Sequence, residues 1–313
     1  MGPFLMQQLF SYQDHPQELT GAVVAIGNFD GVHLGHRAVL NTGLDIAKKN
    51  KVPAGVMFFN PHPRQFFSPD TPLFMLTNQR QKQAIFEQLG LNFSVEQTFD
   101  GTLAAMSAEN FVQQVLVEGL GVSHVVIGYD FFFGAKRGGN PQLMKELGQA
   151  HGFGVDVVAP SGEGGLIYSS TSVRDALEEG QVARAAQILG RNWQVDGAVI
   201  SGAGRGEGLG FPTANITLPP GCHLHHGVYA AFVEFDGESY QAAAYFGKRP
   251  SFDNDAAVLE VFLFDYEGDL YGKQITVEFV EFVRADMKFD NQEALKAQMD
   301  IDCKTVKTIL STA

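Results

Sequence analysis

The sequence predicts two domains, an N-terminal α/β domain built on a parallel sheet and a C-terminal β-rich domain that ends in a helix. Its 313 residues exceed what a single core usually fills, and 45% of them are hydrophobic. Strand-like and helix-like segments alternate up to about residue 190, whereas short strand-like runs follow one another from there. We therefore expect the domains to span residues 1–186 and 187–313.

The N-terminal half begins with a buried strand at 22–27 (AVVAIG), a Gly-, Asp- and His-rich turn, and a helix from about 35 to 50. Pro141 after Asn140 indicates a helix that starts there, with Asn140 as its cap. Parallel sheets covered by helices bind ligands at the carboxyl ends of their strands. The other elements expected in this half are strands at 53–59, 92–96, 123–128 and 153–158 and helices at 78–90, 107–120 and 141–150.

The C-terminal half has Gly- and Pro-rich turns between successive strands, which predicts a barrel or a sandwich. The last segment, about 291–310, is expected to be a helix because Leu295, Met299, Val306 and Ile309 form an apolar stripe. The strands expected before it lie at 193–200, 228–235, 239–246, 258–265 and 274–283.

The chain is acidic, with 22 Lys and Arg against 35 Asp and Glu and a formal net charge of -13. Nucleic-acid backbones and anionic membranes bind proteins through clustered Lys and Arg, so we expect neither as a partner of this acidic chain. A phosphate ligand would need positive charge that is concentrated locally.

Cysteine usage and targeting signals indicate a cytoplasmic protein. Cys222 and Cys303 lie far apart and form no C-x-x-C, which argues against a disulfide framework or a zinc site. The first residues lack the basic region of a signal peptide, and no apolar run approaches membrane-spanning length.

The segment GNFDGVHLGHR at 27–37 joins the first strand to the first helix. A helix N-terminus presents unpaired N–H groups, and His33 and His36 add two imidazoles there, which suits a polyphosphate. Gly35 lets the backbone approach a ligand closely. Two alternatives remain: the histidines only cap and pack the turn, or they bind a metal with His62, the only further ligand nearby.

The segment GYDFFFGAKRGGN at 128–140 also follows a strand. Asp130 can accept hydrogen bonds from a sugar or base, and Lys136 and Arg137 bring positive charge. The three phenylalanines at 131–133 either wall a planar ligand or belong to the core, and for each alone the core is favoured.

The segment SSTSVRDAL at 169–177 precedes and opens a helix. Ser169, Ser170 and Thr171 are typical of a helix cap, and a cap exposes the same N–H groups that bind phosphate. Arg174 could bind a phosphate bidentately, although taken alone it is an ordinary solvated charge.

The C-terminal half opens with GAGRGEGLGFPTANI at 202–216, which is either a phosphate loop or a glycine-rich hairpin. Thr213 and Asn215 offer oxygen ligands of the kind that Mg²⁺ prefers. Glu260 lies on a strand with Phe262, opposite in direction to Val261 and Leu263. Its carboxylate is either a solvent-facing group or a general base.

Together these segments resemble the bacterial bifunctional riboflavin kinase/FMN adenylyltransferases, or prokaryotic FAD synthetases. The resemblance covers nearly the whole chain. The N-terminal motifs are G-N-F-D-G-V-H-L-G-H at 27–36, F-N-P-H-P at 59–63, G-Y-D-F-x-F-G with R-x-G-N at 128–140 and S-S-T-S-V-R at 169–174. The C-terminal motifs are L-G-F-P-T-A-N at 209–215, G-V-Y-A at 227–230, G-K-R-P-S-F at 247–252, D-L-Y-G at 269–272 and R-A-D-M-K-F at 284–289.

For the N-terminal half the resemblance implies a Rossmann-like nucleotidyltransferase domain. In it the 5′-phosphate of FMN attacks the α-phosphorus of ATP and pyrophosphate leaves. The residues implied to bind ATP are Gly27, Phe29, Asp30, Gly31, His33, His36, Ser170, Thr171 and Arg174. Those implied to bind the flavin or nucleotide are Asn60, Asp130, Phe133 and Arg137.

For the C-terminal half the resemblance implies a small antiparallel β-barrel with riboflavin kinase activity. Glu260 would take the proton from the ribityl 5′-hydroxyl of riboflavin, which attacks the γ-phosphate of ATP, while Thr213 and Asn215 hold Mg²⁺. The phosphate loop would comprise Gly204, Arg205, Gly210 and Pro212, and the flavin end Arg284 and Phe289.

This chain departs from the family around the kinase motifs. Tyr245 and Ser251 stand where Asn and Thr are frequent, Glu207 where a basic residue is common, and Asp286 where Glu is common. Three functions therefore remain in view: both activities, adenylyl transfer alone, or a flavin carrier without turnover. The expected partners are ATP, riboflavin and FMN, and the chain is expected to be a monomer or weak homo-oligomer.

Overall fold

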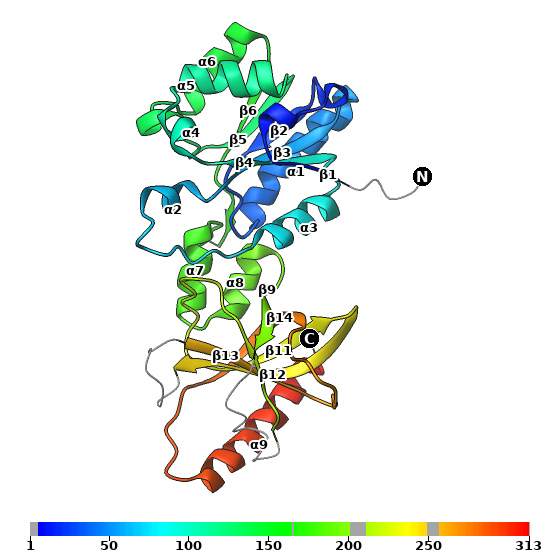
Figure 1. Cartoon of the computed structure of the whole chain (residues 1–313), viewed down its shortest axis with the longest axis vertical. Coiled ribbons are helices and arrows are strands. Elements are labelled where there is room, and N and C mark those ends of the chain that lie inside the picture. The colour runs from blue at the N-terminus through cyan, green and yellow to red at the C-terminus, as the bar shows by residue number, and fades with distance from the viewer. Residues whose placement is uncertain (1–5, 165, 201–210, 249–256, 313) are drawn as a thin grey trace. The chain divides into compact units, whose positions relative to one another are not determined.

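The computed structural model describes residues 6–164, 166–200, 211–248 and 257–312. The chain divides into two compact units, which we treat separately (Figure 1). The first unit runs to Ser169 except for Phe74–Thr77, which belong to the second unit together with the chain from Ser170 onward. The expected boundary at 186/187 falls within helix α8 (Val182–Leu189), so it stays a prediction about where the functional domains meet.

The first unit contains the parallel sheet that the sequence predicts. Its strands lie in the order β1-β4-β3-β2-β5-β6, and every neighbouring pair is parallel. The chain adds strands on one side of β2 and then crosses to β5 on the other side, so the order reverses beside β2. The strands are β1 (Gln7–Leu9), β2 (Val23–Ile26), β3 (Ala54–Asn60), β4 (Phe93–Thr98), β5 (His124–Gly128) and β6 (Gly154–Val158).

The helices of this unit follow the expected pattern, with some additions. Pro141 opens its helix and Asn140 caps it, as predicted. The segment at 107–120 is helical, but most of it, Phe111–Gly119, is a π-helix. The α-helices are α1 (Leu34–Asn50), α2 (Pro63–Phe67), α3 (Gln79–Leu89), α4 (Gly101–Ala105), α5 (Ala108–Asn110) and α6 (Pro141–His151); a small hairpin, β7 (Gly162–Glu163) and β8 (Leu166–Ile167), follows β6.

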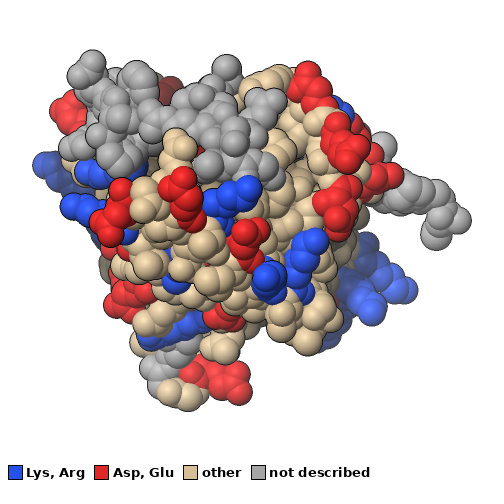
Figure 2. Space-filling model, turned by 90° about the horizontal axis from the view of Figure 1, so that it is seen from below, with Lys and Arg blue, Asp and Glu red and all other residues tan. Residues whose placement is uncertain are grey.

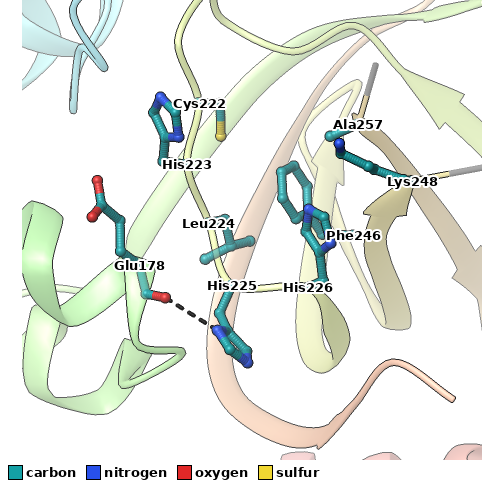
Figure 3. A pocket seen from close by; sticks show the side chains of 9 residues that line it. All are labelled: Glu178, Cys222, His223, Leu224, His225, His226, Phe246, Lys248 and Ala257. Atoms are coloured by element: carbon teal, nitrogen blue, oxygen red, sulfur yellow. Dashed lines mark hydrogen bonds between the residues drawn. The ribbon is translucent and has the colours of Figure 1, made fainter. Parts of the chain in front are cut away.

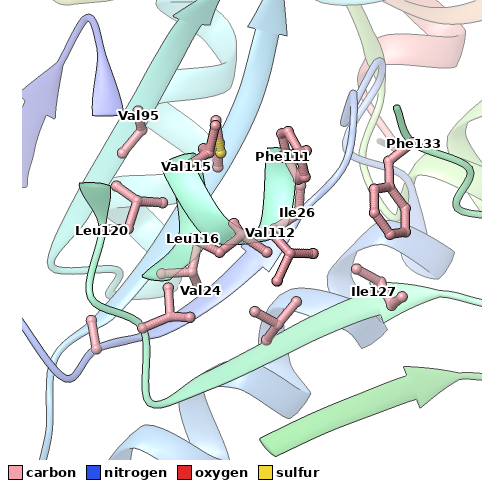
Figure 4. Packing of buried hydrophobic residues seen from close by; sticks show 14 of the residues in the cluster. Val24, Ile26, Val95, Phe111, Val112, Val115, Leu116, Leu120, Ile127 and Phe133 are labelled. Atoms are coloured by element: carbon pink, nitrogen blue, oxygen red, sulfur yellow. The ribbon is translucent and has the colours of Figure 1, made fainter. Parts of the chain in front are cut away.

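Strand β2 is buried on both of its faces. Val24 and Ile26 join one core with Phe111 and Val115 of the π-helix (Figure 4). Val23 and Ala25 point the other way, into a second core that α1 and α3 supply. Covering both faces explains why this strand is a continuous apolar run rather than an alternating one.

The second unit is a closed antiparallel barrel, which decides between the barrel and sandwich alternatives. The strand order is β10-β13-β12-β11-β14-β9. The strands are β9 (Trp193–Ile200), β10 (Ala214–Ile216), β11 (Gly227–Phe235), β12 (Glu238–Lys248), β13 (Ala257–Leu263) and β14 (Gln274–Ala285). Strand β10 was not expected, because only three residues of the P-T-A-N segment form it.

Three helices complete this unit. Helices α7 (Ser170–Glu178) and α8 pack on each other, and α8 also contacts β9 and β14. Helix α9 (Gln292–Leu310) contacts β11, β12 and β14, with Val306 and Leu310 in a core on the outer side of the barrel. In the described part of the chain, no helix is long and apolar enough to cross a membrane.

Candidate functional site

The chain has fewer basic than acidic residues, 22 Lys and Arg against 35 Asp and Glu. On the face seen in Figure 2, Lys and Arg are interspersed with Asp and Glu among the described residues. Any site for a polyphosphate must therefore be built from local groups and backbone dipoles. The structure contains one such place in the first unit, at the carboxyl end of β2.

The turn after β2 lies where the strand order of the sheet reverses. Ligands of open α/β sheets bind at this switch point, outside the carboxyl ends of the strands. The predicted site residues of the first unit follow three adjacent strands, β3, β2 and β5. Asn60 ends β3, the segment 27–36 follows β2, and Asp130 follows β5. The topology thus brings together residues that lie in three separate sequence motifs.

His33 and His36 form a stacked pair at the start of α1. His33 is the cap of this helix, and its Nδ1 accepts a hydrogen bond from the backbone N–H of His36 at 3.2 Å. The two rings are 3.6 Å apart at an angle of 22°. An accepting Nδ1 leaves Nε2 as the N–H donor of a neutral imidazole. The capping alternative is therefore real for His33.

His36 is buried in a way that keeps it uncharged at neutral pH. Its pKa lies well below the usual 6.5, first because of burial and then because of the positive charges of His33 and Lys82. Its Nδ1 atom is buried and has no hydrogen-bond partner among the described residues. Buried polar atoms are nearly always paired, so this nitrogen is a candidate point for a ligand contact at the start of α1.

The turn itself has little room and carries backbone strain. A Cβ on Gly35 would lie 3.0 Å from the His33 ring and 3.0 Å from the carbonyl of Tyr168. Phe29 and Val32 adopt φ angles of 50° and 40°, a left-handed conformation that costs a residue with a side chain about 1–2 kcal/mol. The surrounding structure must hold this shape in place.

Lys82 is the residue of this site that the sequence analysis missed. It lies in the first half of α3, is only 1% exposed, and its Nζ donates to the carbonyl of Asn28 at 3.2 Å. A signal for it existed, because Lys82 occupies the helix face of the buried residues Ile85 and Phe86. A lysine at such a position is rarely buried without a reason.

The remaining predicted site residues of the first unit differ in their exposure and in their contacts. The amide of Asn60 donates to Glu96 at 2.6 Å, and Asp130 is exposed. Phe133 lies in the core, as the sequence favoured, whereas Phe132 is 46% exposed, so its assignment to the core was wrong. The guanidinium of Arg137 lies 4.5 Å from the Phe132 ring centre, a cation–π contact that keeps this ring at the surface.

Ser170, Thr171 and Arg174 belong to the second unit, on α7. Arg174 is not a freely solvated charge, because its Nε donates to the carbonyl of Phe74 at 2.7 Å. The chain just before α7 belongs to the first unit, where Tyr168 lies against Gly35. The role of these three residues in ATP binding stays a prediction.

The predicted kinase residues of the second unit lie in one row across the barrel. Asn215 on β10 stands directly opposite Glu260 on β13, and Glu260 stands opposite Tyr245 on β12. The Thr213 hydroxyl donates to the carboxylate of Glu260 at 3.4 Å. Glu260 is half-buried while Val261 is fully buried, as the predicted alternation requires.

The same row continues to the flavin end. Val228 on β11 pairs with Tyr245 on one side and with Arg284 on β14 on the other. Arg284 donates to Asp302 of α9 at 2.7 and 2.9 Å, and its guanidinium lies 5.9 Å from the ring centre of Phe289. A bidentate pair of this kind fixes the arginine side chain.

Two departures from the family meet in this row. The Tyr245 hydroxyl donates to the carboxylate of Asp286, and Glu260 lies close enough to act on it electrostatically. Burial first, and then the negative charges of Asp286 and Glu260, raise the pKa of Tyr245 to about 12. The two changes relative to the family are therefore coupled rather than independent.

The donors near Glu260 fit a magnesium ion carried by ATP. Thr213 and Asn215 supply a hydroxyl and an amide oxygen, which are hard ligands.

No group of three or more His, Cys, Asp or Glu able to hold a metal occurs in the described ranges, so His33, His36 and His62 form no such group. Pro212 is exposed, and Gly204, Arg205, Gly210, Glu207 and Ser251 lie outside the described residues.

A separate cavity of about 590 Å³ opens in the second unit (Figure 3). It is lined by the loop from Cys222 to His226, the end of α7 at Glu178, and strand residues including Phe246 and Lys248. His225 contacts the Glu178 carbonyl at 3.1 Å. Burial raises the pKa of the Cys222 thiol to about 11, which makes it unreactive at neutral pH. None of the described residues that line the cavity is a predicted kinase residue.

Comparisons with known proteins agree with both halves of the chain. Residues 15–172 match the FAD synthetase family and residues 189–310 match the riboflavin kinase family. The chain is 38% identical to the bifunctional riboflavin kinase/FMN adenylyltransferase of Pseudomonas fluorescens, over 93% of this chain and 94% of that one. It is 36% identical to the enzyme of the same name from Escherichia coli K12, over 97% and 96%.

A solved structure has the same fold over the whole length. It is titled a macrolide-efflux protein from Streptococcus pneumoniae, and it superposes with a TM-score of 0.87 at 27% identity. The match covers 97% of this chain and 99% of that one.

Proposed function

The chain belongs to the family of bacterial bifunctional riboflavin kinase/FMN adenylyltransferases, and from that premise we propose how its residues divide the two reactions. The C-terminal domain phosphorylates riboflavin to FMN with ATP. The N-terminal domain adenylylates FMN to FAD with a second ATP and releases pyrophosphate. The domains that perform these steps are proposed to meet at 186/187.

In the adenylylation step, a phosphate oxygen of FMN displaces pyrophosphate from the α-phosphorus of ATP. No protein nucleophile is needed, so the protein contributes positioning and stabilisation of developing negative charge. The N–H groups at the start of α1, His33 and neutral His36 are proposed to receive the ATP phosphates, which the helix N-terminus and the stacked rings support. The Gly27–Gly31 segment shapes the turn. Ser170, Thr171 and Arg174 are proposed to bind the same phosphates.

The acceptor end of this site is proposed to lie beyond β3 and β5. Asn60 and Asp130 offer hydrogen bonds to the flavin or nucleotide, and Arg137 offers a positive charge beside an exposed aromatic ring. Phe133 lies in the core and would support the wall of the site from behind.

In the kinase step, Glu260 accepts the proton of the ribityl 5′-hydroxyl while the oxygen attacks the γ-phosphorus of ATP, and ADP leaves. Mg²⁺ on the ATP phosphates would supply charge neutralisation, held by Thr213 and Asn215. The Thr213 hydroxyl orients the Glu260 carboxylate. Arg284, fixed by Asp302, and Phe289 border the flavin end, and the segment of Gly204, Arg205, Gly210 and Pro212 is proposed to cover the phosphates.

Two observations support this proposal. For the kinase step, Glu260 lies beside Asn215 and Thr213 on one face of the barrel. For the adenylylation step, the H-x-G-H turn lies at the switch point of the parallel sheet. The test is incubation of the chain with riboflavin and Mg·ATP, followed by chromatography. FMN and then FAD should appear. FAD from supplied FMN but no FMN from riboflavin would indicate adenylyl transfer alone, and neither product would indicate a carrier.

We propose that the protein works in the cytoplasm on ATP, riboflavin and FMN, as a monomer or weak homo-oligomer. Cys222 and Cys303 are both free thiols, which suits a reducing compartment. Sedimentation of the purified chain at several concentrations would test the oligomeric state.

A further inference from the structure

We propose that Lys82 is a positioning residue of the adenylyltransferase site, whose buried ammonium group holds the turn between β2 and α1 in the shape that binds phosphate. The inference rests on the proposed adenylyl transfer at His33 and His36. It assigns a role to a residue that lies in none of the motifs at 27–36, 59–63, 128–140 and 169–174.

The first argument is the position of the ammonium group. Nζ of Lys82 lies 3.2 Å from the carbonyl oxygen of Asn28, which is the second residue after β2. It also lies 5.2 Å from the centre of the Phe58 ring on β3. Lys82 thus joins α3 to the turn that carries both histidines, and this turn includes the strained residues Phe29 and Val32.

The second argument is electrostatic. Asp30 of the turn and Glu96 of β4 act on Lys82 and favour its charged form, while burial lowers its pKa from the usual 10.5. The charge of Lys82 in turn contributes to the lowered pKa of His36, after burial and the neighbouring His33. Among the described residues, His33 and Lys82 therefore act electrostatically on His36, and Asp30 and Glu96 act on Lys82.

The third argument is that stability alone does not call for a lysine here. Replacing a buried charged group and its partners by apolar residues is often neutral or stabilising, and Ile85 and Phe86, which are buried on the same helix, are apolar. A triphosphate at the start of α1 would bring negative charge toward Lys82. The attraction between the buried ammonium group of Lys82 and these phosphates would be stronger than the same attraction in water.

Lys82 and the two histidines are proposed to have different roles in this site. A neutral His36 can offer its ring as a hydrogen-bonding group without the cost of burying an imidazolium. Lys82 supplies the permanent charge, and the histidines supply directed contacts. No proton leaves Lys82 during the reaction, so it acts through the turn and through His36 rather than on the substrate.

The test compares Lys82→Met and Lys82→Gln with the same two substitutions at Lys145, an exposed lysine on α6. Glutamine can still donate to Asn28 but carries no charge, so it separates the hydrogen bond from the charge. We expect both Lys82 variants to lose about a hundredfold in the rate of FMN adenylylation. Riboflavin phosphorylation by the same preparations should be unchanged, and both Lys145 variants should match the parent chain.

Two further readouts address the mechanism. The His36 ring, followed by NMR in histidine-labelled protein, should titrate nearer its ordinary pKa in both Lys82 variants and not in the Lys145 variants. Inorganic pyrophosphate should bind more weakly to the Lys82 variants in calorimetry.

Several outcomes would overturn the proposal. Parent-like adenylylation by folded Lys82→Gln would remove the charge from the mechanism. An unmoved His36 titration would break the link to His36. If neither Lys82 variant folds, the lysine is a folding residue and not a positioning residue. If His36→Ala itself leaves FAD formation intact, the proposed function of the turn fails first, and the two failures are thereby distinguished.

Discussion

The two proposed phosphate sites of this protein use different kinds of residues. The site of the first unit sits on a strand-to-helix turn and gathers a helix N-terminus, two imidazoles and a buried lysine. The site of the second unit sits on the face of a barrel, where an amide, a carboxylate and a tyrosine from three adjacent strands stand in one row.

The difference follows from the two nucleophiles. A phosphate of FMN is already anionic, so adenylyl transfer needs charge stabilisation and no base. A ribityl hydroxyl must lose a proton, so the kinase site needs a carboxylate as base. The chain thus concentrates buried cations in one unit and a strand carboxylate in the other.

The largest expected effect comes from removing the base. Glu260→Gln keeps the shape of the side chain but cannot accept the hydroxyl proton. We expect riboflavin phosphorylation to fall by about 10²–10⁴-fold, while supplied FMN is still converted to FAD. Glu234→Gln, an exposed carboxylate on β11, is the matched control. Unchanged phosphorylation would make Glu260 an ordinary surface carboxylate.

The reciprocal change removes one imidazole from the first unit. His36→Ala should lower FAD formation by about a hundredfold or more, because a charge-stabilising contact is lost, and should leave FMN formation intact. His151→Ala, at the exposed end of α6, controls for the loss of a histidine. A variant that makes FAD at the parent rate would move the adenylyltransferase site elsewhere.

A third prediction tests where the second unit begins. We expect a fragment of residues 170–313 to phosphorylate riboflavin. A fragment of residues 187–313 should be less stable by about 2 kcal/mol or more, because it loses the buried Val182 and Ala185 of α8. Denaturant unfolding of both fragments gives the comparison.

Both fragments also lack Phe74–Thr77, whose Leu76 carbonyl accepts the indole N–H of buried Trp193 at 3.1 Å. Equal unfolding midpoints would show that residues 170–186, which include α7 and the start of α8, do not stabilise the barrel. A folded 170–313 fragment that binds riboflavin and Mg·ATP but yields no FMN would show that the kinase site is incomplete within it.

A smaller effect is expected at Tyr245. Tyr245→Phe leaves the Asp286 carboxylate without its hydroxyl donor beside Glu260. Loss of a hydrogen bond to a charged group corresponds to about tenfold, so we expect the kinase kcat/KM to fall by about that factor. FMN adenylylation is the internal control, and unchanged kinase kinetics would make the coupled departures from the family neutral.

The smallest expected effect is a pH dependence of stability in the first unit. His36 has a folded pKa well below its unfolded value near 6.5, so its contribution is complete above that value. The contribution is lost as the pH falls from 6.5 through the folded pKa. His36→Gln should reduce the acid sensitivity of unfolding, measured between pH 5 and 7, and an unchanged slope would contradict the lowered pKa.

Local sequence determined much of the fold and the candidate sites. The run AVVAIG, the glycine-rich turn and the H-x-G-H opening of α1 are consecutive, so one strand, one turn and one helix follow from neighbouring residues. The two-residue alternation on β13 placed Glu260 opposite in direction to Val261. These features depend on backbone periodicity and capping, which act over a few residues.

Only the tertiary structure decided which distant residues complete these sites. Lys82 reaches Asn28 across 54 positions of the chain, and Tyr245 meets Glu260 and Asp286 through the register of the barrel. Phe74–Thr77 belong to the second unit, whose remaining residues begin at Ser170. Hydrogen bonds from Arg174 to the Phe74 carbonyl and from Trp193 to the Leu76 carbonyl hold this segment in the second unit. The periodicity of apolar residues predicts which face of a helix or strand is buried. Which residues that face contacts depends on how the strands pair and the helices pack in the tertiary structure.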